Sequence, residues 1–142
     1  MPTLLAIAGL PGSGKTRYIN SLRSSIRGHI ADDYMGGAVG FTESRHIVDL
    51  ARALNAGQDS LVCDILFCLP ARRAEFEALI RRLVPAATIE WRFFENDPDR
   101  CLENVRRRVR IRVTREEELI RELSPQYQIP DGATILHVWR PG

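Results

Sequence analysis

Apolar segments of strand length alternate along the chain with segments whose apolar residues recur at helical spacing. The predicted strands span residues 3–8, 28–31, 61–67, 87–94 and 133–139. The predicted helices span residues 15–27, 43–56, 70–83, 98–109 and 115–123. Because strands that alternate with helices form parallel βαβ units, this order predicts an α/β fold, namely a three-layer α/β/α sandwich around a five-stranded parallel sheet.

Local capping signals mark two of the predicted helix starts. Asp97 is a favourable capping residue, and Pro98 after it fits the first helical turn, so this pair predicts the start of the fourth helix. Thr114 and Glu117 have the spacing of a capping box, which predicts that the fifth helix begins at residue 115.

The composition fits one globular domain that spans residues 1–142. Of the 142 residues, 44% are hydrophobic and 27% are charged, which excludes a disordered or fibrous protein and is typical of a chain with a single core. No apolar run approaches the roughly 18 residues that a membrane-spanning helix needs. The first eight residues lack the basic region of a secretory signal, so we expect a cytoplasmic protein.

Neither the cysteines nor the histidines have the spacing of a metal site. The cysteines are an odd set that we expect to be buried, reduced thiols: Cys63, Cys68 and Cys101. The histidines have no Cys or Asp partner pattern, and we expect isolated surface or packed side chains: His29, His46 and His137.

The charge of the whole chain does not indicate a nucleic-acid partner, because the formal net charge is only +2. The basic residues are nonetheless unusual, since Lys15 is the single lysine among 20 Lys and Arg residues. A lysine in a chain that otherwise uses arginine marks a position where a compact ammonium on a flexible stem is needed.

Lys15 lies in a segment that matches the whole phosphate-loop motif G-x-x-x-x-G-K-[ST]. The segment joins the first predicted strand to the first predicted helix and consists of Gly9, Leu10, Pro11, Gly12, Ser13, Gly14, Lys15 and Thr16. Its glycines allow successive backbone N–H groups to face inward, which forms an anion-binding nest at a helix N-terminus. We expect Lys15 to reach the β- and γ-phosphates and the Thr16 hydroxyl to bind Mg²⁺, so the motif predicts binding of ATP with magnesium.

Two carboxylates lie where phosphoryl transfer needs them. Such a group orients or deprotonates the attacking hydroxyl, and ligands of open α/β sheets bind at the carboxyl ends of the strands. Asp32 ends the second predicted strand and is the candidate base, with Asp33 beside it; alternatively, both lie in a solvated turn. Asp64 interrupts an apolar run, where an unpaired carboxylate would be costly, and it either orients metal and substrate or caps a neighbouring loop.

In order and spacing, these motifs resemble the P-loop kinases related to the kinase half of polynucleotide 5′-hydroxyl kinase, within the AAA-like ATPase group that also holds the zeta-toxin kinases. The resemblance covers nearly the whole chain and implies a P-loop NTPase fold of the nucleoside-kinase type. It rests on the phosphate loop at 9–16, Asp-Asp-Tyr at 32–34, Asp64 followed by Arg72 and Arg73, Asn-Asp-Pro at 96–98, and Tyr127 and Pro130 before the last strand.

The resemblance also implies roles for individual residues. Asp32 would be the general base, and Asp64 would help to orient substrate and metal. An arginine-bearing lid would map to residues 106–112, and we place its limits at about 106–115. The remaining candidates are Arg106 and Arg107 for catalysis, Arg108 for ATP, and Asp33, Arg72 and Arg73 for the acceptor; the last two are equally compatible with a solvent-exposed position.

Six arginines fall within residues 106–115, the strongest local charge in the chain. Three interpretations are open. As a lid, these arginines would neutralise the transferred phosphoryl group. As a groove for nucleic acid, they would contact backbone phosphates with strong salt dependence. As a solvated helix face, they would pair with nearby glutamates without a specific role.

Together these features predict a kinase that transfers the γ-phosphate of ATP to a hydroxyl group of a small molecule or of a nucleic-acid 5′ end. One alternative is a nucleotide-binding regulatory ATPase or switch, and another is a nucleic-acid-binding protein with a secondary ATP site. A GTPase is disfavoured because the guanine-reading motif Asn-Lys-x-Asp needs a second lysine.

Overall fold

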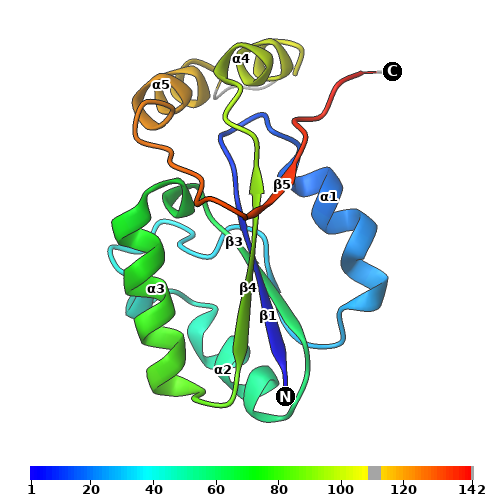
Figure 1. Cartoon of the computed structure of the whole chain (residues 1–142), viewed down its shortest axis with the longest axis vertical. Helices are drawn as coiled ribbons and strands as arrows, with labels where there is room; N and C mark the ends of the chain where they lie inside the picture. The colour runs from blue at the N-terminus through cyan, green and yellow to red at the C-terminus, as the bar shows by residue number, and fades with distance from the viewer. Residues whose placement is uncertain (109–112, 142) are drawn as a thin grey trace.

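The computed structural model describes residues 1–108 and 113–141 and contains a five-stranded sheet (Figure 1). The strands are β1 (Thr3–Ala8), β2 (Ile30–Ala31), β3 (Ser60–Cys63), β4 (Thr88–Phe94) and β5 (Thr134–Leu136). They stand in the order β2-β3-β1-β4-β5, and every neighbouring pair is parallel. This sheet confirms the predicted fold class.

Helices cover both faces of the sheet and its carboxyl end. They are α1 (Lys15–Leu22), α2 (Ile47–Asn55), α3 (Pro70–Leu83), α4 (Pro98–Arg106) and α5 (Val113–Leu123). Figure 1 shows α1 on one side of the sheet, α2 and α3 on the other, and the α4–α5 pair across the end of β4. None of the helices in the described part of the chain is long and apolar enough to cross a membrane.

β1 is the central strand, and its two faces contribute to two separate clusters of buried side chains. Leu4 and Ala6 belong to the larger cluster, which includes side chains of α2 and α3. Leu5 and Ile7 belong to the smaller cluster, which includes side chains of α1. Because successive strand residues point to opposite faces, a strand covered on both sides reads as a continuous apolar run.

Four predicted strands are shorter in the structure, although the one predicted over 87–94 loses only its first residue. The strand predicted over 61–67 ends at Cys63, because the Asp64 side chain accepts the N–H of Leu66 and the chain enters a 3₁₀ turn at Ile65–Cys68. Phe67 and Cys68 are fully buried in this turn, so the apolar run reflects burial in a turn rather than extension of the strand. The strands predicted over 28–31 and 133–139 are β2 and β5, with their narrower bounds.

The helix boundaries also differ in places. The helix predicted over 15–27 is α1 followed by a 3₁₀ turn at Arg23–Ser25, and the one predicted over 43–56 begins at Ile47, after a 3₁₀ turn at Phe41–Glu43. The capping box at Thr114 is wrong, since α5 already includes Val113 and Thr114 lies inside it. The Asp97 cap is confirmed, because its side chain accepts the N–H of Arg100 at 3.1 Å.

Candidate active site

The loop between β1 and α1 contains two glycines in a backbone conformation that other residues rarely adopt. Gly12 and Gly14 have φ angles of 81° and 103°, in the left-handed region that favours glycine. A Cβ atom at Gly12 would lie 2.5 Å from the carbonyl oxygen of Cys101 in α4, so this position has no room for a side chain. The loop is therefore shaped both by its own glycines and by the helix packed on its outer side.

The ammonium of Lys15 lies within this loop. Its Nζ donates to the carbonyl oxygens of Gly9 at 2.7 Å and Leu10 at 2.8 Å. The N–H of Ser13 also donates to the Leu10 carbonyl, at 3.2 Å. The Leu10 carbonyl therefore accepts hydrogen bonds from both the ammonium and this loop amide, which holds the Lys15 side chain against the loop at the start of α1.

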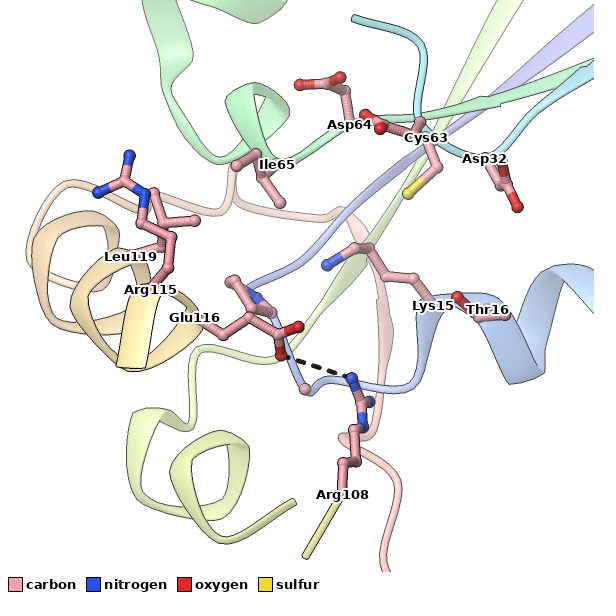
Figure 2. A pocket seen from close by; sticks show the side chains of 13 residues that line it. Lys15, Thr16, Asp32, Cys63, Asp64, Ile65, Arg108, Arg115, Glu116 and Leu119 are labelled. Carbon is pink, nitrogen blue, oxygen red and sulfur yellow. Dashed lines mark ion pairs between the residues drawn. The ribbon is translucent and has the colours of Figure 1, made fainter. Parts of the chain in front are cut away.

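A cavity of about 300 Å³ opens beside the loop. Figure 2 shows its two sides: Lys15, Thr16 and Asp32 on the side of the sheet and α1, and side chains of α5 opposite them. The full lining consists of Pro11, Gly12, Lys15, Thr16, Asp32, Asp33, Cys63, Asp64, Ile65, Arg108, Arg115, Glu116 and Leu119.

Asp32 and Asp33 reach the cavity from the turn after β2, which ends at Ala31. Both side chains are exposed, so their carboxylates keep their access to water and to a ligand. β2 pairs with β3, and β3 pairs with β1, so the parallel order brings the ends of three strands to the phosphate loop. This placement agrees with the expected position of a carboxylate for phosphoryl transfer.

Asp64 lines the same cavity, but it is only 3% exposed and its oxygens hold the surrounding chain. One oxygen accepts the N–H of Leu66 at 2.9 Å, and the other accepts the N–H of Met35 at 2.8 Å. Burial raises the pKa of this carboxyl, and the two backbone hydrogen bonds partly oppose that rise. Asp64 therefore ties the loop after Tyr34 to the turn after β3, as expected if it caps a neighbouring loop. It also lines the cavity.

The arginines of the predicted lid divide into two groups. Arg108 and Arg115 line the cavity, and the Arg108 guanidinium lies 3.6 Å from Glu116 (Figure 2). Arg106 instead pairs with Glu117 at 2.7 Å, and Arg107 is exposed; neither lines the cavity, in contrast to the catalytic roles expected for them. Two further arginines of the predicted lid, Arg110 and Arg112, lie outside the described residues.

Arg72 and Arg73 do not line the cavity, in contrast to the expectation that they bind the acceptor. Arg72 is exposed and pairs with Glu75 at 3.2 Å. Arg73 is only 8% exposed, and its guanidinium donates to the backbone carbonyls of Phe67 and Gln128, each at 2.7 Å. Both of these bonds serve the fold, because they join the turn after Asp64 to the connection between α5 and β5.

Two histidines form a pair, so the expectation of three isolated histidines is wrong. His29 Nε2 and His46 Nδ1 lie 2.8 Å apart, within hydrogen-bond distance. His29 precedes β2 and His46 precedes α2, so the pair ties together two connections near Asp32. The cysteines are buried and free, as predicted.

The cavity also contains residues that sequence analysis missed. Glu116 and Leu119 lie about one helical turn apart in α5. Together with Arg115, they form the face that α5 turns toward the phosphate loop. Their spacing within a predicted helix was visible in the sequence, but no motif indicated which face of that helix would meet the loop.

The donors around the cavity suit a magnesium ion better than a softer metal. The Thr16 hydroxyl and the carboxylates of Asp32, Asp33 and Asp64 are oxygen donors, which Mg²⁺ prefers. Within residues 1–108 and 113–141, no group of three or more His, Cys, Asp or Glu side chains is close enough to hold a metal ion. Mg²⁺ usually binds through one or two protein ligands together with substrate phosphates and water.

A scan against protein-family models and a search of curated proteins gave no match. Solved structures do match over nearly the whole chain. A gluconokinase from Sinorhizobium meliloti 1021 is 12% identical, with 99% of this chain and 84% of that chain covered and a TM-score of 0.58. A fungal RNA kinase is 15% identical, with 99% and 76% covered and a TM-score of 0.67.

A third match is Kti12 from Chaetomium thermophilum in complex with ADP-AlF3, which is 19% identical, with 94% of this chain and 88% of that chain covered and a TM-score of 0.59. At these identities the similarity establishes the fold. The chain therefore has the fold of P-loop kinases, as the phosphate loop and the order of strands and helices predicted.

Proposed function

We propose that this protein is an ATP-dependent kinase that transfers the γ-phosphate of ATP to a hydroxyl group. The observation that carries the proposal is the content of one cavity: Lys15, Thr16 and Asp32 face it from the sheet side, and Arg108 and Arg115 face it from the opposite side. Phosphoryl transfer depends mainly on positioning and charge neutralisation, and this cavity offers groups for both.

In this proposal the phosphate tail of ATP lies on the loop amides, beside the ammonium of Lys15. Arg108 and Arg115 neutralise charge on the transferred group, because they are the arginines of the predicted lid segment that line the cavity. Thr16 holds the metal, together with one of the carboxylates. When bound, Mg²⁺ neutralises negative charge on the β- and γ-phosphates.

Asp32 acts as the general base. Its exposed carboxylate takes the proton of the acceptor hydroxyl while the hydroxyl oxygen forms a bond to the γ-phosphorus. The bond between that phosphorus and the bridging oxygen of ADP breaks, and ADP leaves with the electron pair. Asp64 is less suited to this role, because both of its oxygens already accept backbone hydrogen bonds.

The acceptor is a hydroxyl of a small molecule or of a nucleic-acid 5′ end. Both classes occur among proteins of this fold, since one similar structure is a gluconokinase and another is an RNA kinase. Radiolabelled ATP with a panel of nucleosides, sugars, sugar acids and 5′-hydroxyl oligonucleotides would identify the acceptor class.

Two variants and a matched control test the site. We expect Lys15→Ala to lose ATP binding, and Asp32→Asn to keep ATP binding while transfer falls by about 10²–10⁴, the usual contribution of a general base. Asp131→Asn makes the same change in an exposed turn before β5 and should leave transfer unchanged. If Asp32→Asn kept transfer within a fewfold of the unaltered protein, Asp32 would not be the base.

The same experiments distinguish the alternatives. Binding of ATP without transfer to any acceptor would favour a nucleotide-dependent regulator. Tight, salt-sensitive binding of oligonucleotides that persists in Lys15→Ala would favour a nucleic-acid-binding protein whose ATP site is secondary.

A further inference from the structure

Asn104 is a polar residue on the buried face of α4. It is only 3% exposed, and its buried neighbours on the helix are Cys101 and Val105. This face packs on the phosphate loop, because a Cβ atom at Gly12 would lie 2.5 Å from Cys101 O and 2.8 Å from Val105 Cγ2. The amide of Asn104 therefore stands behind the loop, on the side away from the cavity.

Both protons of this amide are used by backbone carbonyls. Nδ2 donates to Gly12 O at 2.9 Å, across 92 residues of sequence, and to Trp139 O at 2.8 Å. Because both partners are carbonyl oxygens, which accept hydrogen bonds, the NH₂ end of the Asn104 amide must face them. The oxygen Oδ1 is buried and accepts no hydrogen bond from the described residues.

Trp139 completes a ring of hydrogen bonds. Its backbone N–H donates to Ser13 O at 2.9 Å. Two loop carbonyls are therefore held from behind: that of Gly12 by Asn104 and that of Ser13 by Trp139. Asn104 in turn holds the carbonyl of Trp139. The guanidinium of Arg17, in the first turn of α1, lies 4.4 Å from the centre of the Trp139 ring.

The ring determines the orientation of two peptide groups of the loop, those that follow Gly12 and Ser13. In a planar trans peptide, the carbonyl and the following N–H point in opposite directions. Holding Gly12 O against α4 places the N–H of Ser13 on the opposite side of that peptide, where it donates to Leu10 O within the loop. Holding Ser13 O against Trp139 turns the N–H of Gly14 away from Trp139.

We propose that Asn104 positions the phosphate loop: its two N–H groups hold the carbonyls of Gly12 and Trp139 behind the loop, so that the Gly12 carbonyl stays turned away from the phosphates. This inference rests on the proposed nucleotide binding and concerns a residue that does not line the cavity. Without these donors, the peptide after Gly12 can turn its carbonyl inward, where it would repel an anion.

Asn96 provides a matched control. Its side-chain Nδ2 also donates to two backbone carbonyls, Ser124 O at 2.8 Å and Tyr127 O at 3.3 Å. Those carbonyls belong to the connection between α5 and β5 rather than to the phosphate loop. Asn96→Ala therefore removes the same kind of bonds and should affect stability without affecting phosphate binding.

The test compares the unaltered protein with Asn104→Ala, Asn104→Asp and Asn96→Ala by calorimetric titration with two probes, ATP and inorganic tripolyphosphate, each with magnesium. We expect both Asn104 variants to bind both probes about 10-fold more weakly or worse, because they lose the two donors behind the loop. Asn96→Ala should stay within about twofold of the unaltered protein, since the two carbonyls that it holds lie outside the phosphate loop. At saturating ATP, kcat of the Asn104 variants should change far less than KM for ATP.

A folded Asn104 variant that binds both probes as tightly as the unaltered protein would overturn the proposal. Asn104→Asp keeps the shape of the side chain but places a buried carboxylate against two carbonyl oxygens, so the NMR measurement on the unaltered protein carries the test if the variants do not fold. In the unaltered protein, tripolyphosphate should shift the side-chain amide signals of Asn104 in nitrogen-15 NMR and not those of Asn96; unshifted Asn104 signals would also overturn it. Binding of tripolyphosphate without transfer to any acceptor would count against the kinase and not against this role.

Discussion

Gly12→Ala tests how tightly α4 packs on the phosphate loop. Alanine at a φ of 81° lies in the left-handed region, which costs roughly 1–2 kcal/mol. Its Cβ would also lie 2.5 Å from Cys101 O and 2.8 Å from Val105 Cγ2, and forcing atoms into a packed interior costs roughly 1–3 kcal/mol. The free energy of unfolding should therefore fall by about 2–5 kcal/mol, which is a large part of the stability of an ordinary domain.

Gly57→Ala separates the two contributions. Gly57 follows α2 with a φ of 79°, and a Cβ atom there has nothing within 4 Å. This variant carries the backbone strain alone, so it should lose only roughly 1–2 kcal/mol. Any gain from restricting the unfolded chain is common to both variants and cancels in the comparison.

Urea unfolding followed by circular dichroism measures both changes. We expect the same m value for all three proteins and a midpoint that is lowest for Gly12→Ala. We also expect Gly12→Ala to bind ATP more weakly, because relief of the overlap moves either α4 or the loop. Equal destabilisation by the two substitutions would show that the contact between α4 and the loop has room for a methyl group, and the reasoning would fail.

Further predictions concern groups away from this contact. Arg73→Met should lower the free energy of unfolding by about 2–4 kcal/mol in urea titrations, because two backbone carbonyls lose a charged donor. KM for ATP should stay unchanged. A changed KM with unchanged stability would contradict a structural role. The thiols of all three cysteines should resist alkylation by iodoacetamide at pH 8 in the native protein and should react in urea. Mass spectrometry measures the extent of alkylation. Burial raises their pKa values to about 12, about 11 and about 12, so the reactive thiolates are scarce; rapid native labelling would contradict the buried positions of Cys63, Cys68 and Cys101.

The parts of the fold that the sequence predicts are those with local signals. The phosphate loop is a contiguous motif, and its position between an apolar run and an amphipathic helix indicated a βαβ unit. Asp32 follows a strand end, so the parallel sheet brings it to the loop without further information. The alternation of elements was sufficient for the parallel sheet, although not for its strand boundaries.

The remaining errors involve contacts between distant segments. Nothing near Arg73 in the sequence shows that Phe67 and Gln128 supply carbonyls for its guanidinium, so its burial could not be predicted. The His29–His46 pair likewise depends on two connections that meet only in the fold. In the lid segment, the helical phase of α5 decides that Arg115 faces the cavity, and the sequence did not fix that phase relative to the loop.

The hydrogen bond between Asn104 and Gly12 has a consequence for folding. The phosphate loop is encoded within the first sixteen residues, but its support comes from a residue 92 positions later and from Trp139. Contacts of such high sequence separation close large chain loops and form slowly. A fluorescent nucleotide added during refolding should therefore bind only in the last kinetic phase, after the secondary structure seen by circular dichroism has formed.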